Sequence, residues 1–211
     1  GAPAAVVGLL FPHLVLAALP LAVLVAQNFS VPFGGLRLGP VEILVGASAI
    51  AWASRGVAER RLEWSPGPVQ RALLAWLWVI GLSLLASASL SAGLSETAKW
   101  LEILLLAAIT PAIAGGGRAR YVVWGVAAAG VVAALLGLYQ FVTASGPPGF
   151  MLMGRFMRAY GTFRQPNPYA AHLGLSLPFA AGWSLAGPVG RRERWILLAA
   201  AAVMAMGIMA S

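Results

Sequence analysis

Three arginines lie in one short segment, residues 145–166, where their side chains could bind a phosphate group. Arg155 and Arg158 are three residues apart, so on a helical turn they would project from one face. Arg164 follows soon after them, because Gly161 allows a tight turn. Guanidinium groups hold phosphate oxygens through paired hydrogen bonds and stay charged near lipid. The spacing favours an anion site, and the alternative is a set of arginines that anchor the loop at a membrane surface.

The segment ends in a pattern that is typical of a helix start. Pro166 and Pro168 flank Asn167, and asparagine is a frequent N-cap residue while proline suits the first helical positions. We therefore expect a helix that begins at Asn167. The free backbone N–H groups of its first turn would add to the anion site beside the arginines.

These residues resemble the signature of a known family, the O-antigen ligase and polymerase superfamily. The preceding stretch from Gly137 to Phe141 is similar to that family's helix before the loop, and the likeness extends to the Leu-x-Leu-Pro sequence that ends at Pro178. The motif that carries the resemblance reads Arg158-x-x-Gly161-Thr162-Phe163-x-x-Pro166-Asn167, followed by an aromatic residue at Tyr169.

The resemblance implies a multispan glycosyltransferase of the bacterial inner membrane. Such enzymes take a glycan from undecaprenyl diphosphate on the periplasmic side and join it to the lipid A-core of lipopolysaccharide, to another glycan or to a protein. It implies that Arg158 is the catalytic contact to the diphosphate. It also implies a longer whole protein, with about 12 spans of roughly 20 residues each and a later loop that supplies a catalytic histidine. On that view the chain is the N-terminal half and is inactive alone.

Charge and proximity add further substrate-binding candidates to Arg158. We expect Arg155, Arg164 and Asn167 to contribute, and Lys99 as well. Glu96, Lys99 and Glu102 recur at intervals of three, so they line one face at the outer end of the predicted fourth helix. Lys99 then either adds to the phosphate site or belongs to a structural ion-pair cluster, since it can reach both carboxylates.

No metal or cofactor is expected. The chain has no cysteine and only two histidines, His13 and His172, which are far apart in the sequence. His13 is expected to pack within an apolar helix. His172 lies near the arginines but does not match the family's catalytic histidine, so the base that deprotonates the acceptor is expected outside this chain. What the chain can supply is electrostatic stabilisation of the departing diphosphate.

The composition excludes a water-soluble domain. Hydrophobic residues make up 60% of the chain and charged residues 9%, and the mean hydropathy is +0.85. We therefore predict an all-α fold, a polytopic transmembrane helix bundle that forms one domain over residues 1–211. Its seven candidate spans are residues 5–27, 41–54, 71–93, 100–116, 121–144, 167–187 and 195–211, of which 41–54 is short for a bilayer.

The loop cations predict the orientation of these spans. One set of alternate loops holds nine of the 14 Lys and Arg residues and the other holds the remaining five, Arg37, Lys99, Arg155, Arg158 and Arg164. Cytoplasmic loops carry the excess of cations, which places the N-terminus in the cytoplasm and residues 145–166 in the periplasm. The formal charge of +8 is thereby explained by membrane topology and not by nucleic-acid binding.

Two other classes of protein stay open at this stage. A transporter of a small anion such as bicarbonate would also use inward-facing arginines and helices broken by proline. A non-catalytic membrane scaffold is the third class. A later periplasmic loop with Arg and His would favour glycan transfer, and an inverted repeat of the helices would favour transport.

Overall fold

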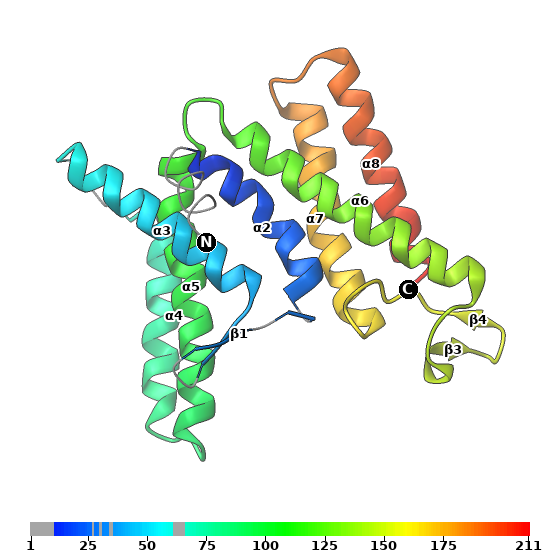
Figure 1. The fold of residues 1–211 in the computed structure, drawn as a ribbon, viewed down its shortest axis with the longest axis horizontal. Coiled ribbons are helices and arrows are strands. Elements are labelled where there is room, and N and C mark those ends of the chain that lie inside the picture. Colours follow the sequence, from blue (N-terminus) through cyan, green and yellow to red (C-terminus); the bar gives the residue numbers. More distant parts are fainter. Residues whose placement is uncertain (1–10, 27, 30, 34–35, 61–65) are drawn as a thin grey trace. The chain divides into compact units, whose positions relative to one another are not determined.

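The described part of the chain is all-α, as predicted, in a computed structural model. The structure describes residues 11–26, 28–29, 31–33, 36–60 and 66–211. The start of the predicted first span at residue 5 and Arg61, one of the nine cations, lie outside the described residues. The helices are α2 (Pro12–Ala26), α3 (Pro40–Ala58), α4 (Pro68–Leu84), α5 (Leu90–Ala114), α6 (Ala119–Thr143), α7 (Pro166–Ala186) and α8 (Arg191–Met209) (Figure 1).

Two small antiparallel hairpins, which the sequence did not predict, interrupt the helices. Strands β1 (Val31–Phe33) and β2 (Leu36–Leu38) pair with Val31 opposite Leu38. Strands β3 (Met151–Leu152) and β4 (Phe156–Met157) form the second hairpin, inside the arginine-rich loop.

Three of the described helices, α3, α5 and α6, are long and apolar enough to cross a membrane. Helices α2 and α4 are apolar but shorter. The sequence prediction took residues 41–54 for the weakest span, yet α3 has 19 residues and is one of the three. Its start is fixed by Glu42, whose carboxylate accepts a hydrogen bond from the Gly39 N–H at 2.8 Å. Association with a membrane is thus supported, and a bundle of seven spans stays a prediction.

The boundary between α4 and α5 differs from the prediction, which placed one helix at 71–93 and the next at 100–116. The break falls instead at residues 85–89. It is caused by hydrogen bonds that two serine side chains make to the nearby backbone. Ser87 Oγ donates to the Ser89 carbonyl at 3.0 Å, and Ser89 Oγ caps α5 by accepting from the Ala92 N–H at 3.4 Å. Serine side chains that bond to nearby backbone compete with the helix in this way. Glu96 and Lys99 consequently lie inside α5 and not before it.

The chain divides into two compact units, the first of which comprises residues 1–16 and 44–119. Within this unit α4 and α5 lie side by side as a hairpin (Figure 1). Gln70 Nε2 donates to the Ala107 carbonyl at 2.7 Å, and the rings of Trp76 and Trp100 meet edge to face at 5.5 Å. The first contact lies toward the open end of the hairpin and the second near its middle.

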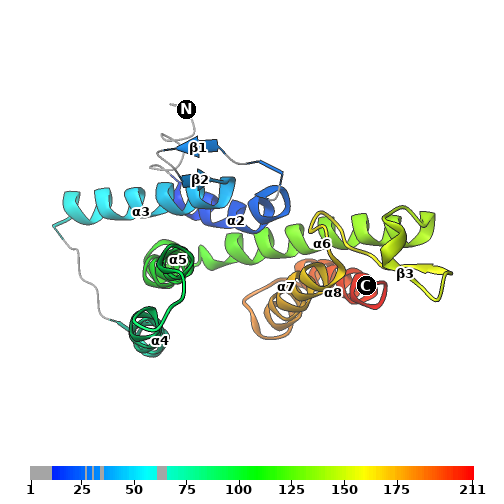
Figure 2. The ribbon, with the colours of Figure 1, turned by 90° about the horizontal axis from the view of Figure 1, so that it is seen from below.

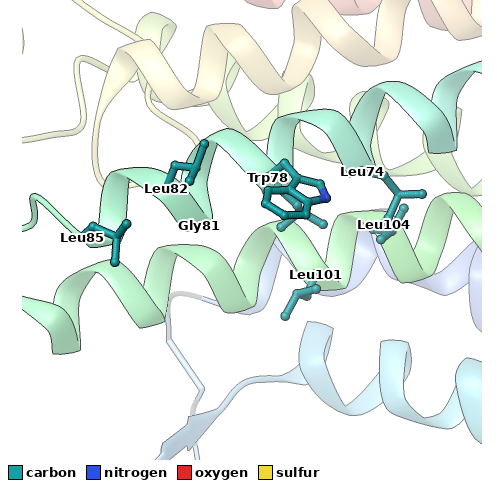
Figure 3. A pocket seen from close by; sticks show the side chains of 8 residues that line it. Leu74, Trp78, Gly81, Leu82, Leu85, Leu101 and Leu104 are labelled. Carbon is teal, nitrogen blue, oxygen red and sulfur yellow. The ribbon is translucent and has the colours of Figure 1, made fainter.

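An apolar groove of about 490 Å³ runs along this helix pair (Figure 3). Leucine side chains and Trp78 line it, including Leu74, Leu82 and Leu101. Such a surface suits lipid acyl chains and offers no group that could perform chemistry. This groove is therefore not the candidate site.

The second unit comprises residues 17–43 and 120–211 and contains the arginine-rich loop. Helices α7 and α8 lie side by side in it (Figure 2), and their core with α6 is rich in alanine. Buried glycines of α6 and α8 also lie there. A Cβ on Gly130 of α6 would collide with the Met204 sulfur of α8, so close approach of these helices requires a residue without a side chain. At one end of the helices, Trp124 Nε1 of α6 donates to Glu193 of α8 at 2.9 Å.

Candidate functional site

The arginine-rich loop folds as a hairpin and not as a helical turn, which corrects the first prediction. In the pairing of β3 with β4, Met151 lies opposite Met157 and Leu152 opposite Phe156. Met153 and Gly154 take left-handed conformations, with φ of 53° and 65°, which reverse the chain between the strands. Arg155 and Arg158 therefore do not share a helix face.

Arg155 lies at the turn of this hairpin and is exposed. Its guanidinium carbon is 5.4 Å from the centre of the Phe156 ring, within the range of a cation–π contact. The Phe156 ring in turn stacks on Phe141 of α6, with ring centres 6.5 Å apart. The Arg155 side chain therefore lies at the edge of the loop, against an aromatic ring that itself packs on α6.

Arg158 is held from both its backbone and its side chain. Its N–H donates to the Phe150 carbonyl at 3.0 Å, which fixes where the side chain leaves the loop. Nε donates to the backbone oxygen of Ser211 at 2.9 Å, and Nη2 donates to Asn167 Oδ1 at 3.3 Å. Among the described residues these bonds use two of the five guanidinium N–H groups. The side chain is partly exposed and therefore accessible to a ligand.

Asn167 is not the N-cap residue that the sequence predicted. Helix α7 begins at Pro166, its N-cap residue is Gln165, and no side chain caps it. Asn167 lies within the first turn, and its side-chain oxygen accepts the bond from Arg158. Proline at the first helical position has no N–H to be capped. The amide oxygen of Asn167 is therefore used to orient the guanidinium.

Gln140 of α6 fixes the backbone between Arg158 and α7. Its Oε1 accepts hydrogen bonds from the N–H of Gly161 at 2.8 Å and of Tyr160 at 3.2 Å, while its Nε2 donates to the Gly161 carbonyl at 3.0 Å. The side chain is buried. One amide thus satisfies three backbone groups that would otherwise lack partners in an apolar environment.

Tyr169 completes this frame from α7. Its side chain is fully buried and lies against three glycines, each of which would collide with it if it carried a Cβ. Gly137 comes from α6, Gly161 from the loop and Gly207 from α8. Gly161 also has a φ of 55°, a conformation that favours glycine. Because these three positions are glycines, α6, the loop and α8 can all pack against the Tyr169 ring.

The buried Tyr169 hydroxyl allows a prediction about the free energy of unfolding of the protein. It is buried and has no hydrogen-bond partner among the described residues, and such a group costs about 1 to 3 kcal/mol. We expect Tyr169→Phe to raise the free energy of unfolding by about 1 kcal/mol, measured by denaturation with dodecyl sulfate in mixed micelles. Tyr139→Phe, at an exposed tyrosine of α6, should change it by less than about 0.5 kcal/mol. A loss of stability in Tyr169→Phe would contradict the unpaired state of this hydroxyl.

The remaining residues that the sequence analysis considered are Arg164, Lys99 and His172. Arg164 is exposed in the turn before α7, with a φ of 58°. Lys99 is exposed in the first unit, where it pairs with Glu96 at 2.6 Å, so its part in the site stays a prediction. His172 packs against the Phe163 ring at 5.1 Å, and its Nε2 is shielded from solvent. In the described part of the chain no group of three or more His, Asp or Glu residues could hold a metal ion.

The role of Gln140 was not predicted from the sequence, although the residue stands in the stretch that resembles the family. A glutamine near the end of an apolar helix is the only sequence signal for it. Comparison of the chain with family models, with curated proteins and with solved structures finds no match. The resemblance therefore rests on the residues themselves, several of which the structure joins in one framework. Chemically, that framework offers a rigid, partly exposed guanidinium that can bind an anion.

Proposed function

We propose that the chain belongs to a membrane glycosyltransferase of the O-antigen ligase and polymerase type. Its donor is a glycan on undecaprenyl diphosphate, and its acceptor is lipid A-core, a second glycan or a protein. The observation that carries the proposal is the contact of Arg158 with Asn167, residues of the motif that are nine positions apart. Gln140, which bonds to Gly161 across 21 positions, holds the same loop in place.

In the proposed reaction Arg158 binds the diphosphate of the donor. It stays bound to the diphosphate while the diphosphate departs as the leaving group. Negative charge grows on the diphosphate as the anomeric C–O bond breaks, and a fixed guanidinium stabilises that charge without having to reorganise. The acceptor hydroxyl attacks the anomeric carbon after a base outside this chain has taken its proton. Arg155, Arg164, Asn167 and Lys99 are the proposed substrate-binding residues. The reaction as proposed uses no metal or cofactor.

The proposed location is the bacterial inner membrane, with the N-terminus in the cytoplasm and the loop of Arg158 in the periplasm. The distribution of the 14 Lys and Arg residues supports this orientation, and the three long apolar helices support insertion. Seven spans remain part of the proposal.

The test is a transfer assay with the full-length protein in liposomes. Labelled glycan on undecaprenyl diphosphate is supplied with lipid A-core, and we expect the label to move to the acceptor as undecaprenyl diphosphate is released. The same liposomes are assayed for uptake of labelled bicarbonate. Uptake without transfer would overturn the proposal and leave the small-anion transporter as the function.

A further inference from the structure

A polar cavity of about 310 Å³ lies in the first unit, where α3 and α5 end. Its volume is at the lower limit of small-molecule sites. Trp52 and Ile113 form its apolar wall, and among the described residues its charged lining is Arg55, Glu59 and Arg118. It differs from the apolar groove of Figure 3, which contains no charged group, and it belongs to a different unit from the loop of Arg158.

The charges of this cavity come from segments far apart in the sequence. Arg55 is half-buried in the last turn of α3, and Arg118 is exposed in the connection between α5 and α6. His13, near the start of α2, is also close enough for both arginines to act on it electrostatically. Among the described residues that line the cavity, two arginines stand against one carboxylate, Glu59. This part of the lining therefore carries a net positive charge.

The approach of Arg118 depends on a glycine turn. Gly116 and Gly117 have φ of 64° and 83°, conformations that residues with side chains rarely adopt. A Cβ on either of them would meet no atom within 4 Å. The glycines are therefore needed for the shape of the turn and not for packing. That turn places Arg118 opposite the end of α3.

We infer that this cavity is a second anion site, which binds a phosphate group between Arg55 and Arg118. A guanidinium has five N–H groups, so Arg55 and Arg118 can each direct a pair of them at a phosphate group beside the other contacts that they make. The phosphate comes either from a phospholipid headgroup or from a soluble phosphate compound. Glu59 opposes binding by repulsion, which limits the affinity. This site is separate from the proposed transfer site and does not depend on it.

Two probes distinguish the sources of phosphate, both applied to the purified chain in dodecyl maltoside. Inorganic phosphate is titrated against chloride of equal ionic strength while Tm is measured, and phosphatidylglycerol is added before native mass spectrometry. At ten times its Kd, bound phosphate should raise Tm by about 3 °C. Binding of the inorganic ion alone indicates a soluble source, and retention of lipid alone indicates a headgroup. If the wild-type chain binds neither probe, the inference is wrong.

Variants test the residues themselves. Arg55→Gln combined with Arg118→Gln should weaken binding of the effective probe at least about tenfold. The matched control is Arg191→Gln combined with Arg194→Gln, two exposed arginines of α8, which should change it less than about threefold. Equal binding by the two double variants would overturn the inference.

A substitution at Glu59 distinguishes a specific loss of binding from a loss that is caused by misfolding. Glu59→Gln removes the carboxylate from the cavity lining, so binding of the same probe should tighten by about threefold. A misfolded chain cannot bind more tightly. Weaker binding by Glu59→Gln would contradict the assignment of phosphate to this cavity.

Discussion

Replacing Arg158 by lysine is expected to remove most of the transfer activity of the full-length protein, although the charge is kept. An ammonium group cannot reproduce the two-pronged contact with phosphate oxygens. Its N–H groups also leave a single nitrogen, so they do not match the spacing of the bonds that Nη2 and Nε of Arg158 make to Asn167 and to the Ser211 carbonyl, at 3.3 and 2.9 Å. A charged hydrogen bond lost from such a site costs about 2 to 4 kcal/mol, or roughly 30-fold to nearly 1000-fold in rate.

The matched control is Arg60→Lys, at an exposed arginine just after α3. A solvated side chain there should tolerate the change at a cost well under about 1 kcal/mol. Transfer of labelled glycan in liposomes measures both variants at equal amounts of inserted protein. If Arg158→Lys stays within about threefold of wild type, Arg158 is an interface anchor and the proposed site loses its main contact to the diphosphate.

The positions of the helices could largely be predicted because long apolar stretches leave few other structures. The error at α4 and α5 has a local cause. Alanine and leucine continue on both sides of residues 85–89, so hydropathy alone does not show the break, which depends on hydrogen bonds of Ser87 and Ser89. Side-chain bonds of this kind depend on conformation as well as on composition.

The structure brings Arg158 and Asn167 into contact, but the loop does so as a hairpin and not as the predicted helical turn. Arginines three residues apart suggested a helical turn, but the left-handed conformations of Met153 and Gly154 produce a hairpin. The spacing of like residues is compatible with several conformations when the segment is short. Which one forms is decided by contacts from distant elements, such as the Ala159 N–H bond to the Ala210 carbonyl at 2.8 Å.

Gln140 illustrates why the framework of the site could not be predicted. The three backbone groups that it bonds belong to Tyr160 and Gly161, which are 20 and 21 residues away in the sequence. No periodic pattern in the sequence marks these residues. A buried glutamine is expensive unless both ends of its amide are paired, so its presence in an apolar helix is informative only once the partner is known. The rigidity of the loop therefore depends on a long-range contact.

Gln140→Leu is expected to have the largest effect on stability. The substitution keeps the volume of the side chain but leaves the N–H groups of Tyr160 and Gly161 and the Gly161 carbonyl without the partners they have now. Each buried polar group left unpaired costs about 1 to 3 kcal/mol. Since Tyr160 is only half-buried, we expect a total loss of about 3 to 5 kcal/mol and a fall in Tm of about 10 °C.

Gln70 provides the matched control for this substitution. It is a half-buried glutamine in α4 that makes one hydrogen bond, to the Ala107 carbonyl at 2.7 Å, so Gln70→Leu should cost about 1 kcal/mol. Both variants are measured by thermal unfolding in dodecyl maltoside and by transfer activity below the lower Tm. Because Gln140 holds the backbone that carries Arg158, Gln140→Leu should also lower the transfer rate, whereas Gln70→Leu should not. Equal stability of the two variants would mean that the loop is held by its other contacts, above all by the packing of Tyr169 against Gly161.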